Sequence, residues 1–518
     1  MKFIVYILEG GSKMYNLWTI LAFVVYLLAM IGIGVIFSKK SANMSDYFLG
    51  GRGMNSWLTA LSAQASDMSS WLLMGLPGAI YLSGLGEAWI AVGLGVGTYL
   101  NWLLIAKRLR KYSVVANDSI TIPEYFQNRF DSSSSALKVT CAVIIFIFFL
   151  IYTASGFNAA AKLLNTVFGM NYTVGLTVGV VIIMIYTFLG GYFAVVWTDF
   201  FQGMLMFFAL MIVPIIAYGF VKADFSQIIH SVPGNPEYMS FIRGKDGNYY
   251  SWQYIVSNLG WGLGYFGMPH ILVRFMSIKS ADMIKKSRII ASVWVFITLV
   301  ASVVVALTGY AYMVKTGMTI FTDASGSETI FMLLVQKLTP GFIAGILLCA
   351  IVAAIMSTSD SQLLVTASAV ANDIYKAVIN KDATDKQLLT LSRIAIIVVG
   401  VVAFLIALNP NNSVMGLVSY AWAGLGAAFG PTMLLSLFWK RMTMSGALAG
   451  MISGGATVII WKQFLGKILL VGRDGTVLYE LVPAFVISII FIVVISLISP
   501  KPSQKVIDDF EKVNSIDL

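Results

Sequence analysis

The sequence has few charged residues for its length. Of 518 residues only 11% are charged, whereas soluble domains carry roughly 25%. Hydrophobic residues make up 58%, and the mean hydropathy is +0.84. No polar stretch is long enough for a soluble domain, and no Walker-type phosphate loop occurs. These absences exclude a fused kinase or nucleotide-binding module, argue against ATP as the energy source, and indicate a membrane protein.

Cysteine and histidine are also scarce. Cys141 and Cys349 both lie in apolar runs, where small core residues are expected and a disulfide is not. His230 and His270 have no Cys or Glu partner at metal-ligand spacing. The net charge of +10 would suit nucleic acid, but in a membrane chain it is more typical of cytoplasmic loops. We therefore expect neither an enzyme nor a nucleic-acid-binding protein, and infer no obligatory protein partner.

Apolar runs of about 20 residues, each long enough to cross a bilayer, recur from end to end. They predict an all-α polytopic protein with about thirteen transmembrane helices: 16–37, 55–79, 85–107, 138–163, 172–190, 195–220, 252–275, 286–314, 341–375, 390–408, 413–438, 444–464 and 481–499. Most of the 34 basic residues fall in connections that share one side when the N-terminus is outside. We expect a single transmembrane domain with a cytoplasmic C-terminus.

Two of these spans contain helix breakers. The span 55–79 has the polar stretch 60–71 around Asp67 and then Gly75, Pro77 and Gly78. The span 252–275 has four glycines and a proline within ten residues. The two lie five spans apart, so equivalent helices would cross the membrane in opposite directions. Such a pair predicts a secondary transporter built from inverted repeats. The alternative is two unbroken helices that pack closely through glycine.

A third unusual stretch, Ser357-Thr358-Ser359-Asp360, lies inside the span 341–375. Hydroxyl groups can bond to their own helix, so Ser and Thr alone would be weak evidence of a site. Asp360 is stronger evidence, because an ionisable group within a span costs about 2.5–3.5 kcal/mol and usually lines a cavity or pathway.

These segments together could hold a hard cation such as Na⁺, which prefers several oxygen ligands. The carbonyls of Ala65 and Met68, three residues apart, can converge at the interruption. Ala354, Ser357 and Thr358 follow i, i+3, i+4 spacing and share one helix face. We predict that the two sets form one oxygen cage.

An organic partner is also expected. The N-terminus of a half-helix presents free N–H groups that suit a carboxylate. Trp261 and Tyr265 are i, i+4 neighbours beside the second break, and Tyr152 lies in another span. Their faces suit a ring or an alkylammonium group. The alternative for these aromatics is packing within the bundle or anchoring at the membrane interface.

Several motifs resemble the sodium:solute symporter family, and in particular its bacterial sodium/proline symporters: 50–52, 65–69, 71–78, 197–199, 262–267 with 269–270, 356–358 and 417–424. The likeness extends from about residue 16 to 500. It implies a LeuT-type core of two inverted five-helix repeats, at about 55–220 and 252–438, with peripheral helices 16–37, 444–464 and 481–499. It also implies a bacterial cell-membrane location.

The resemblance further implies Na⁺-coupled import of L-proline and assigns residues to it. The implied sodium ligands are Ala65, Met68, Ala354, Ser357 and Thr358. Sodium coupling is assigned to Asp67, Ser69, Asp199 and Arg52, the last two toward the cytoplasm. The implied proline pocket contains Ser69, Tyr152, Trp261, Tyr265, Met268 and Pro269. A second ion site built from Asp199, Asp360 and Ser361, as in some relatives, is a further expectation; the alternative for Asp360 is a carboxylate solvated in the cytoplasmic exit path.

Two residues depart from the pattern of proline symporters. Ser70 replaces the usual glycine after Asp-Met-Ser, and Met268 replaces the usual glutamine before Pro-His. Both lie beside the inferred pocket, so another small amino acid or a betaine-like solute remains an alternative substrate. A sensor or ion channel on the same fold is a third hypothesis, and the absence of an attached signalling domain argues against the sensor.

Overall fold

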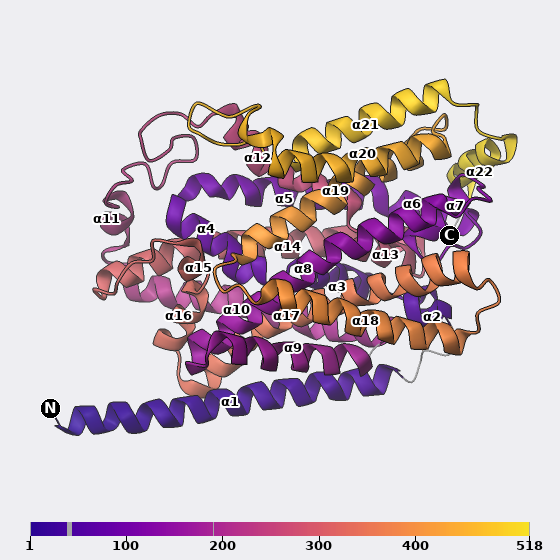
Figure 1. The fold of residues 1–518 in the computed structure, drawn as a ribbon. Coiled ribbons are helices and arrows are strands. Elements are labelled where there is room, and N and C mark those ends of the chain that lie inside the picture. Colours follow the sequence, from indigo (N-terminus) through magenta and orange to yellow (C-terminus); the bar gives the residue numbers. More distant parts are fainter. Residues whose placement is uncertain (1, 39–43, 190, 517–518) are drawn as a thin grey trace.

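The computed structural model describes residues 2–38, 44–189 and 191–516, which form a bundle of long helices lying side by side (Figure 1). Within these ranges, ten helices are long and apolar enough to cross a membrane. Nine are α1 (Lys2–Ser38), α8 (Ala136–Phe168), α10 (Tyr192–Val221), α14 (Ile284–Lys315), α17 (Gly341–Ser368), α18 (Asp385–Ala407), α19 (Val414–Phe438), α20 (Met444–Gln463) and α21 (Leu481–Ile498). α14 is preceded directly by the short η6 (Ala281–Met283).

The tenth span is composite. It runs from Leu85 to Val115 through η3 (Leu85–Ala88), α5 (Trp89–Leu100), the π-helical η4 (Asn101–Ala106) and α6 (Lys107–Val115). Shorter apolar helices cover Trp71–Ser83 and Tyr172–Phe188, the latter within α9 (Tyr172–Leu189). Together with the interrupted segment 252–277, these elements account for the thirteen predicted spans.

The bundle is buried at its centre and apolar at its circumference. α1 lies along one flank, and α20 and α21 lie along the opposite flank (Figure 1). Of the ten long spans, those of α17 and α19 are the most buried. Large apolar side chains are exposed on the outer helices, for example Leu28, Phe296 and Ile490. Such exposure would be costly in water but suits contact with lipid.

The two ends of the bundle differ. One end gathers α2 (Met44–Leu49), η1 (Gly50–Arg52), α6, α7 (Ile122–Arg129) and the C-terminal α22 (Gln504–Ser515) (Figure 1). Since α6 contributes Lys107, Arg108, Arg110 and Lys111 there, we call it the basic end. The opposite end carries α11 (Phe225–His230), α15 (Ala324–Ser327) and α16 (Ile330–Leu338) (Figure 1); η8 (Leu465–Lys467) lies between α20 and α21.

Glycine allows the second interrupted segment to pack unusually close to α5. A Cβ atom on Gly262 would lie 2.2 Å from the carbonyl oxygen of Gly93, and one on Gly97 would lie 2.4 Å from the carbonyl oxygen of Gly262. Close packing through glycine, which the sequence offered as an alternative to a break, therefore accompanies the break. Cys141 and Cys349 are buried free thiols, as expected.

Candidate functional site

The first break lies where the sequence predicts it. α3 (Ser56–Asp67) ends at Asp67, and Met68 leaves the helical region with φ −78° and ψ 72°. The chain resumes as the π-helical η2 (Trp71–Gly75) and α4 (Leu76–Ser83). Leaving helical geometry frees backbone carbonyls of the last turn from their usual partners. These carbonyls are buried, so they need other donors or a cation.

Ser357 brings two of the predicted cage oxygens together. The Ser357 hydroxyl on α17 donates to the carbonyl of Ala65 at 2.7 Å and also reaches that of Ala354 at 3.3 Å. Thr358 is buried, and its hydroxyl has no hydrogen-bond partner. Met68 is fully buried directly after α3. Hydroxyl and carbonyl oxygens keep lone pairs when they hydrogen-bond each other, so this set can still ligate a hard cation.

A direct hydrogen bond joins the two breaks. The Tyr265 hydroxyl donates to Oδ2 of Asp67 at 2.7 Å, and both side chains are buried. Oδ1 of Asp67 has no partner. The Trp71 indole donates to the Asp67 backbone carbonyl at 3.2 Å. The sequence analysis assigned Asp67 to sodium coupling and Tyr265 to the substrate pocket. The structure adds that the two side chains are hydrogen-bonded to each other.

The second break is formed by η5 (Trp261–Gly267), a 3₁₀ segment between α12 (Trp252–Gly260) and α13 (Pro269–Ser277). Met268 is extended, with φ −84° and ψ 104°, and its carbonyl accepts from the backbone N–H groups of Ile271 and Leu272. Pro269 occupies the first turn of α13, where its missing N–H is not needed. The Met268 side chain is fully buried.

Aromatic residues line the same region, and one that the sequence analysis did not assign links them. The Trp422 indole on α19 donates to the Trp261 carbonyl at 2.8 Å and packs edge-on against the Tyr265 ring, with centroids 5.1 Å apart. Trp261 in turn stacks on Tyr479 at 5.4 Å. The Trp422 side chain leaves no room for a Cβ on Gly264, which would lie 2.0 Å from its indole nitrogen.

Tyr152 of α8 is buried in this region with its hydroxyl unpartnered. Its ring packs edge-on against the buried His270 at 6.4 Å. Ser69 is also buried, and its hydroxyl accepts from the backbone N–H of Trp71 at 3.4 Å. The contact between Tyr152 and His270 could not be predicted from the sequence, which shows only that His270 follows Pro269.

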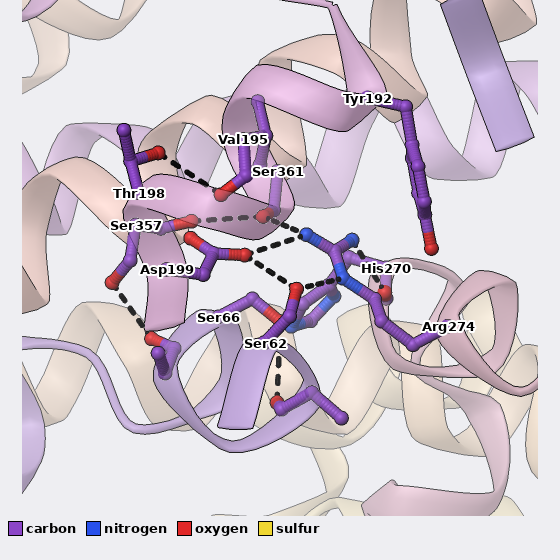
Figure 2. A network of polar contacts seen from close by, with 12 residues as sticks. Ser62, Ser66, Tyr192, Val195, Thr198, Asp199, His270, Arg274, Ser357 and Ser361 are labelled. Atoms are coloured by element: carbon purple, nitrogen blue, oxygen red, sulfur yellow. Dashed lines mark hydrogen bonds and ion pairs between the residues drawn. The ribbon is translucent and has the colours of Figure 1, made fainter. Parts of the chain in front are cut away.

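An arginine to which the sequence analysis assigned no role occupies the centre of a buried network (Figure 2). Nη2 of Arg274 on α13 lies 3.1 Å from Oδ2 of Asp199 on α10, and both side chains are almost fully buried. Asp199 also accepts the Ser62 hydroxyl at 2.6 Å. Arg274 further donates to Ser62 at 3.2 Å, to Ser361 at 2.5 Å and to the His270 carbonyl at 2.8 Å. α3, α10, α13 and α17 thus meet at one guanidinium group.

The predicted second ion site is divided. Ser361 joins Asp199 through Arg274 and donates to the Ser357 carbonyl at 2.8 Å, one turn from the cage. Asp360 faces α9 instead, where its Oδ1 accepts the Thr187 hydroxyl. Successive helix residues point about 100° apart, which explains why Asp360 and Ser361 meet different neighbours. Asp360 is buried in this structure, with Oδ2 unpartnered, so its carboxylate is not exposed to solvent here; its place in a cytoplasmic exit path stays a prediction.

Arg52 lies at the basic end and does not contact Asp199. Its guanidinium pairs with Asp118 at 3.0 Å and donates to the Met276 carbonyl at 2.7 Å. It also donates to the Ser113 hydroxyl and the Ser119 carbonyl. Arg52 therefore connects η1 to the end of α13 and to the segment between α6 and α7 through hydrogen bonds and an ion pair.

Comparison with known proteins places this geometry in a family. The model of the sodium:solute symporter family matches residues 47–454. This chain belongs to that family. It is a family of symporters, so the expectation of a transporter and not an enzyme is confirmed, and the chain is a multi-pass membrane protein.

Several relatives match nearly the whole chain. The sodium/proline symporter of Escherichia coli (strain K12) is 46% identical, with 93% of this chain and 94% of that protein covered. The osmoregulated proline transporter OpuE of Bacillus subtilis (strain 168) is 45% identical, with 93% and 94% covered. The high-affinity proline transporter PutP of the same strain is 44% identical, with 93% and 98% covered.

Two solved structures share the fold. A Na⁺-coupled sialic acid symporter in a substrate-bound outward-open state superposes with a TM-score of 0.77 at 20% identity, covering 94% of this chain and 99% of that one. A nucleobase-cation-symport-1 family transporter gives 0.52 at 14% identity, covering 91% and 98%. These similarities confirm the expected LeuT-type helical fold.

Proposed function

We propose that the chain couples inward movement of Na⁺ to the uptake of L-proline by alternating access. The observation that carries this proposal is the Asp67–Tyr265 hydrogen bond, because it connects the helix break beside the oxygen cage to the break beside the aromatic residues. Relatives at 44–46% identity that bear the names of proline transporters or sodium/proline symporters support the choice of solute.

Na⁺ binds, in this proposal, to the carbonyls of Ala65, Met68 and Ala354 and the hydroxyls of Ser357 and Thr358. The Ser357–Ala65 contact already joins α17 to the end of α3. A cation between them fixes the break and with it the position of Asp67. Asp67 and Ser69 then transmit ion binding to the substrate side through Tyr265.

Proline binds between the two breaks. Its carboxylate is held at free backbone N–H groups of a half-helix, and its ring lies against Tyr152, Trp261 and Tyr265. Met268 and Pro269 shape the second break. A bound ring and a filled cage both favour closure at the opposite end, after which the basic end opens.

The basic end is proposed to face the cytoplasm of a bacterial cell, with the N-terminus outside, since it holds the cluster in α6. Arg52 and Asp199 lie on the route toward it. The two inverted repeats are proposed to span about 55–220 and 252–438 and to rock against each other, with the helices 16–37, 444–464 and 481–499 outside the core. No obligatory protein partner is part of the proposal.

The test is uptake of radiolabelled proline into proteoliposomes that contain the purified chain. We expect uptake above equilibrium with an inward Na⁺ gradient and none when K⁺ replaces Na⁺. Equal uptake with the two cations would refute the coupling.

A second candidate substrate is another small amino acid or a betaine-like solute. The observation in its favour is that Ser70 and Met268, the two residues unusual for proline symporters, are both fully buried, and the Ser70 hydroxyl has no hydrogen-bond partner. A buried hydroxyl of this kind could select a solute with one more polar group. A competition panel decides: unlabelled proline should compete best, and a better competitor would identify the alternative.

A further inference from the structure

A buried carboxylate lies beyond the site described above, toward the basic end. Asp373 belongs to η7 (Ala369–Ile379), the π-helical continuation of α17, and is fully buried. Its Oδ1 accepts from the Thr121 hydroxyl and the Asn372 amide, each at 3.2 Å. Its Oδ2 has no hydrogen-bond partner, and no ion pair in the described residues includes it. Burying such a group is costly unless a partner joins it for part of the working cycle.

Asp373 lines a small cavity that leads back to the central network. The cavity has a volume of about 20 Å³, room for one water molecule or one small cation. Its walls include Asp373, Thr121, Ser368 and Arg274. The Ser368 hydroxyl is buried and, like Oδ2 of Asp373, unpartnered. Arg274 already pairs with Asp199, so Asp373 supplies the unpaired acid of this cavity.

The π-helical geometry of η7 turns Asp373 toward the helix face that carries Ser357, Ser361 and Ser368. In an α-helix of 3.6 residues per turn, the five residues from Ser368 would rotate Asp373 by about 140° away. The i→i+5 bonding of a π-helix winds the chain more slowly, so five residues come closer to one full turn and Asp373 lies nearer the face of Ser368. Ser368 itself lies eleven residues, about three turns, beyond Ser357. Ser357, Ser361, Ser368 and Asp373 therefore follow one face of α17 and η7 from the cage toward the basic end.

We propose that Asp373, with the hydroxyls of Thr121 and Ser368, is a transient Na⁺ site through which the ion leaves toward the basic end. One carboxylate and two hydroxyls are hard oxygen ligands, and the single charge suits brief occupancy by a monovalent cation. Arg274 forms the boundary between this cavity and the cage. The proposal rests on the Na⁺-coupled transport proposed above and adds a residue to it.

The test separates Na⁺ release from the other steps of transport. Net proline uptake requires release of Na⁺ into the lumen, whereas proline–proline exchange with saturating Na⁺ on both sides does not. In proteoliposomes oriented with the basic end inward, we expect Asp373→Asn to slow net uptake about tenfold, a typical cost of losing a carboxylate near a metal site. Exchange should stay close to that of the unchanged protein. The lumenal Na⁺ concentration that half-inhibits uptake should rise.

Two variants serve as controls. Asp373→Glu keeps the carboxylate and should restore most of the net uptake. Asp382→Asn makes the same chemical change at an exposed residue after η7 and should leave both rates unchanged. Equal slowing of uptake and exchange by Asp373→Asn would overturn the proposal in favour of a structural role, and unchanged net uptake would overturn it too. If the unchanged protein shows no Na⁺-driven uptake, the proposed function itself fails, which is a distinct outcome.

Discussion

The ammonium group of Lys162 lies 2.6 Å from the carboxylate of Glu328, and both side chains are almost fully buried. Glu328, between α15 and α16, also accepts the backbone N–H groups of Val414 and Met415 at 3.0 Å each, at the start of α19. Glu328 thus lies at the N-terminus of α19, the positive end of that helix dipole, although Glu328 is not part of α19. Three separate elements, α8, the α15–α16 segment and α19, are joined at the end opposite the basic end.

Removal of one partner of this pair should destabilise the protein strongly. Lys162→Met leaves Glu328 buried without its cation, and breaking a buried pair in this way costs about 3–5 kcal/mol. Lys162→Met combined with Glu328→Met removes both charges and should cost less than Lys162→Met alone. Thermal unfolding in detergent measures both effects. A double variant less stable than Lys162→Met alone would contradict this account.

Asp67→Asn should weaken Na⁺ activation of proline uptake far more than it lowers protein abundance. The substitution keeps the size and an oxygen for the Tyr265 hydroxyl but replaces the second carboxyl oxygen, beside the predicted cage, with an amide group. Measurement of uptake against Na⁺ concentration, with membrane abundance by immunoblot, separates the two. Tyr265→Phe is the companion variant, since it leaves the Asp67 carboxyl group in place but without this donor. Normal Na⁺ dependence in Asp67→Asn would remove Asp67 from the mechanism.

Arg274→Lys should impair transport although it conserves the charge. Arg274 donates from Nε, Nη1 and Nη2 to four acceptors, and the single ammonium of lysine cannot reproduce that fork. Each lost hydrogen bond to a charged group is worth about 1.5–3 kcal/mol. We expect a lower unfolding temperature and slower net uptake. Arg393→Lys, at an exposed position of α18, is a matched control and should change neither.

Gly264→Ala should lower the affinity for proline by displacing Trp422. A Cβ at this position meets the indole nitrogen at 2.0 Å, so the ring or η5 has to move. Overpacking of this kind costs about 1–3 kcal/mol. Equilibrium binding of labelled proline measures the effect. Gly219→Ala, where a Cβ meets nothing within 4 Å, is the control, and Trp422→Phe should partly relieve Gly264→Ala.

The positions of the two breaks followed from local sequence. Breaks at Asp67 and at Trp261–Met268 are properties of glycine, proline and polar residues in an apolar span, which are readable one segment at a time. Ser357 was identifiable for the same reason, because its helix face could be counted from the spacing.

Contacts between residues on different helices could not be predicted from local sequence in the same way. Arg274 lies near the end of a predicted span, and nothing in the local sequence indicates its partner; only the fold reveals that this partner is Asp199 of α10. Trp422 was visible only as part of a motif. The separation of Asp360 from Ser361, in contrast, was available from the helix repeat, since adjacent residues cannot face the same neighbour.

α17 and η7 together hold three of the five proposed Na⁺ ligands (Ala354, Ser357 and Thr358) and the proposed exit carboxylate. Ser357 lies near the middle of the span Gly341–Ile379, and Asp373 lies near one end. On the proposed route the ion crosses the membrane field in two parts, one on binding and one on release. An elementary charge gains about 2.3 kcal/mol per 100 mV over the whole field. Hyperpolarisation should therefore raise the apparent affinity for external Na⁺ as well as the maximal rate.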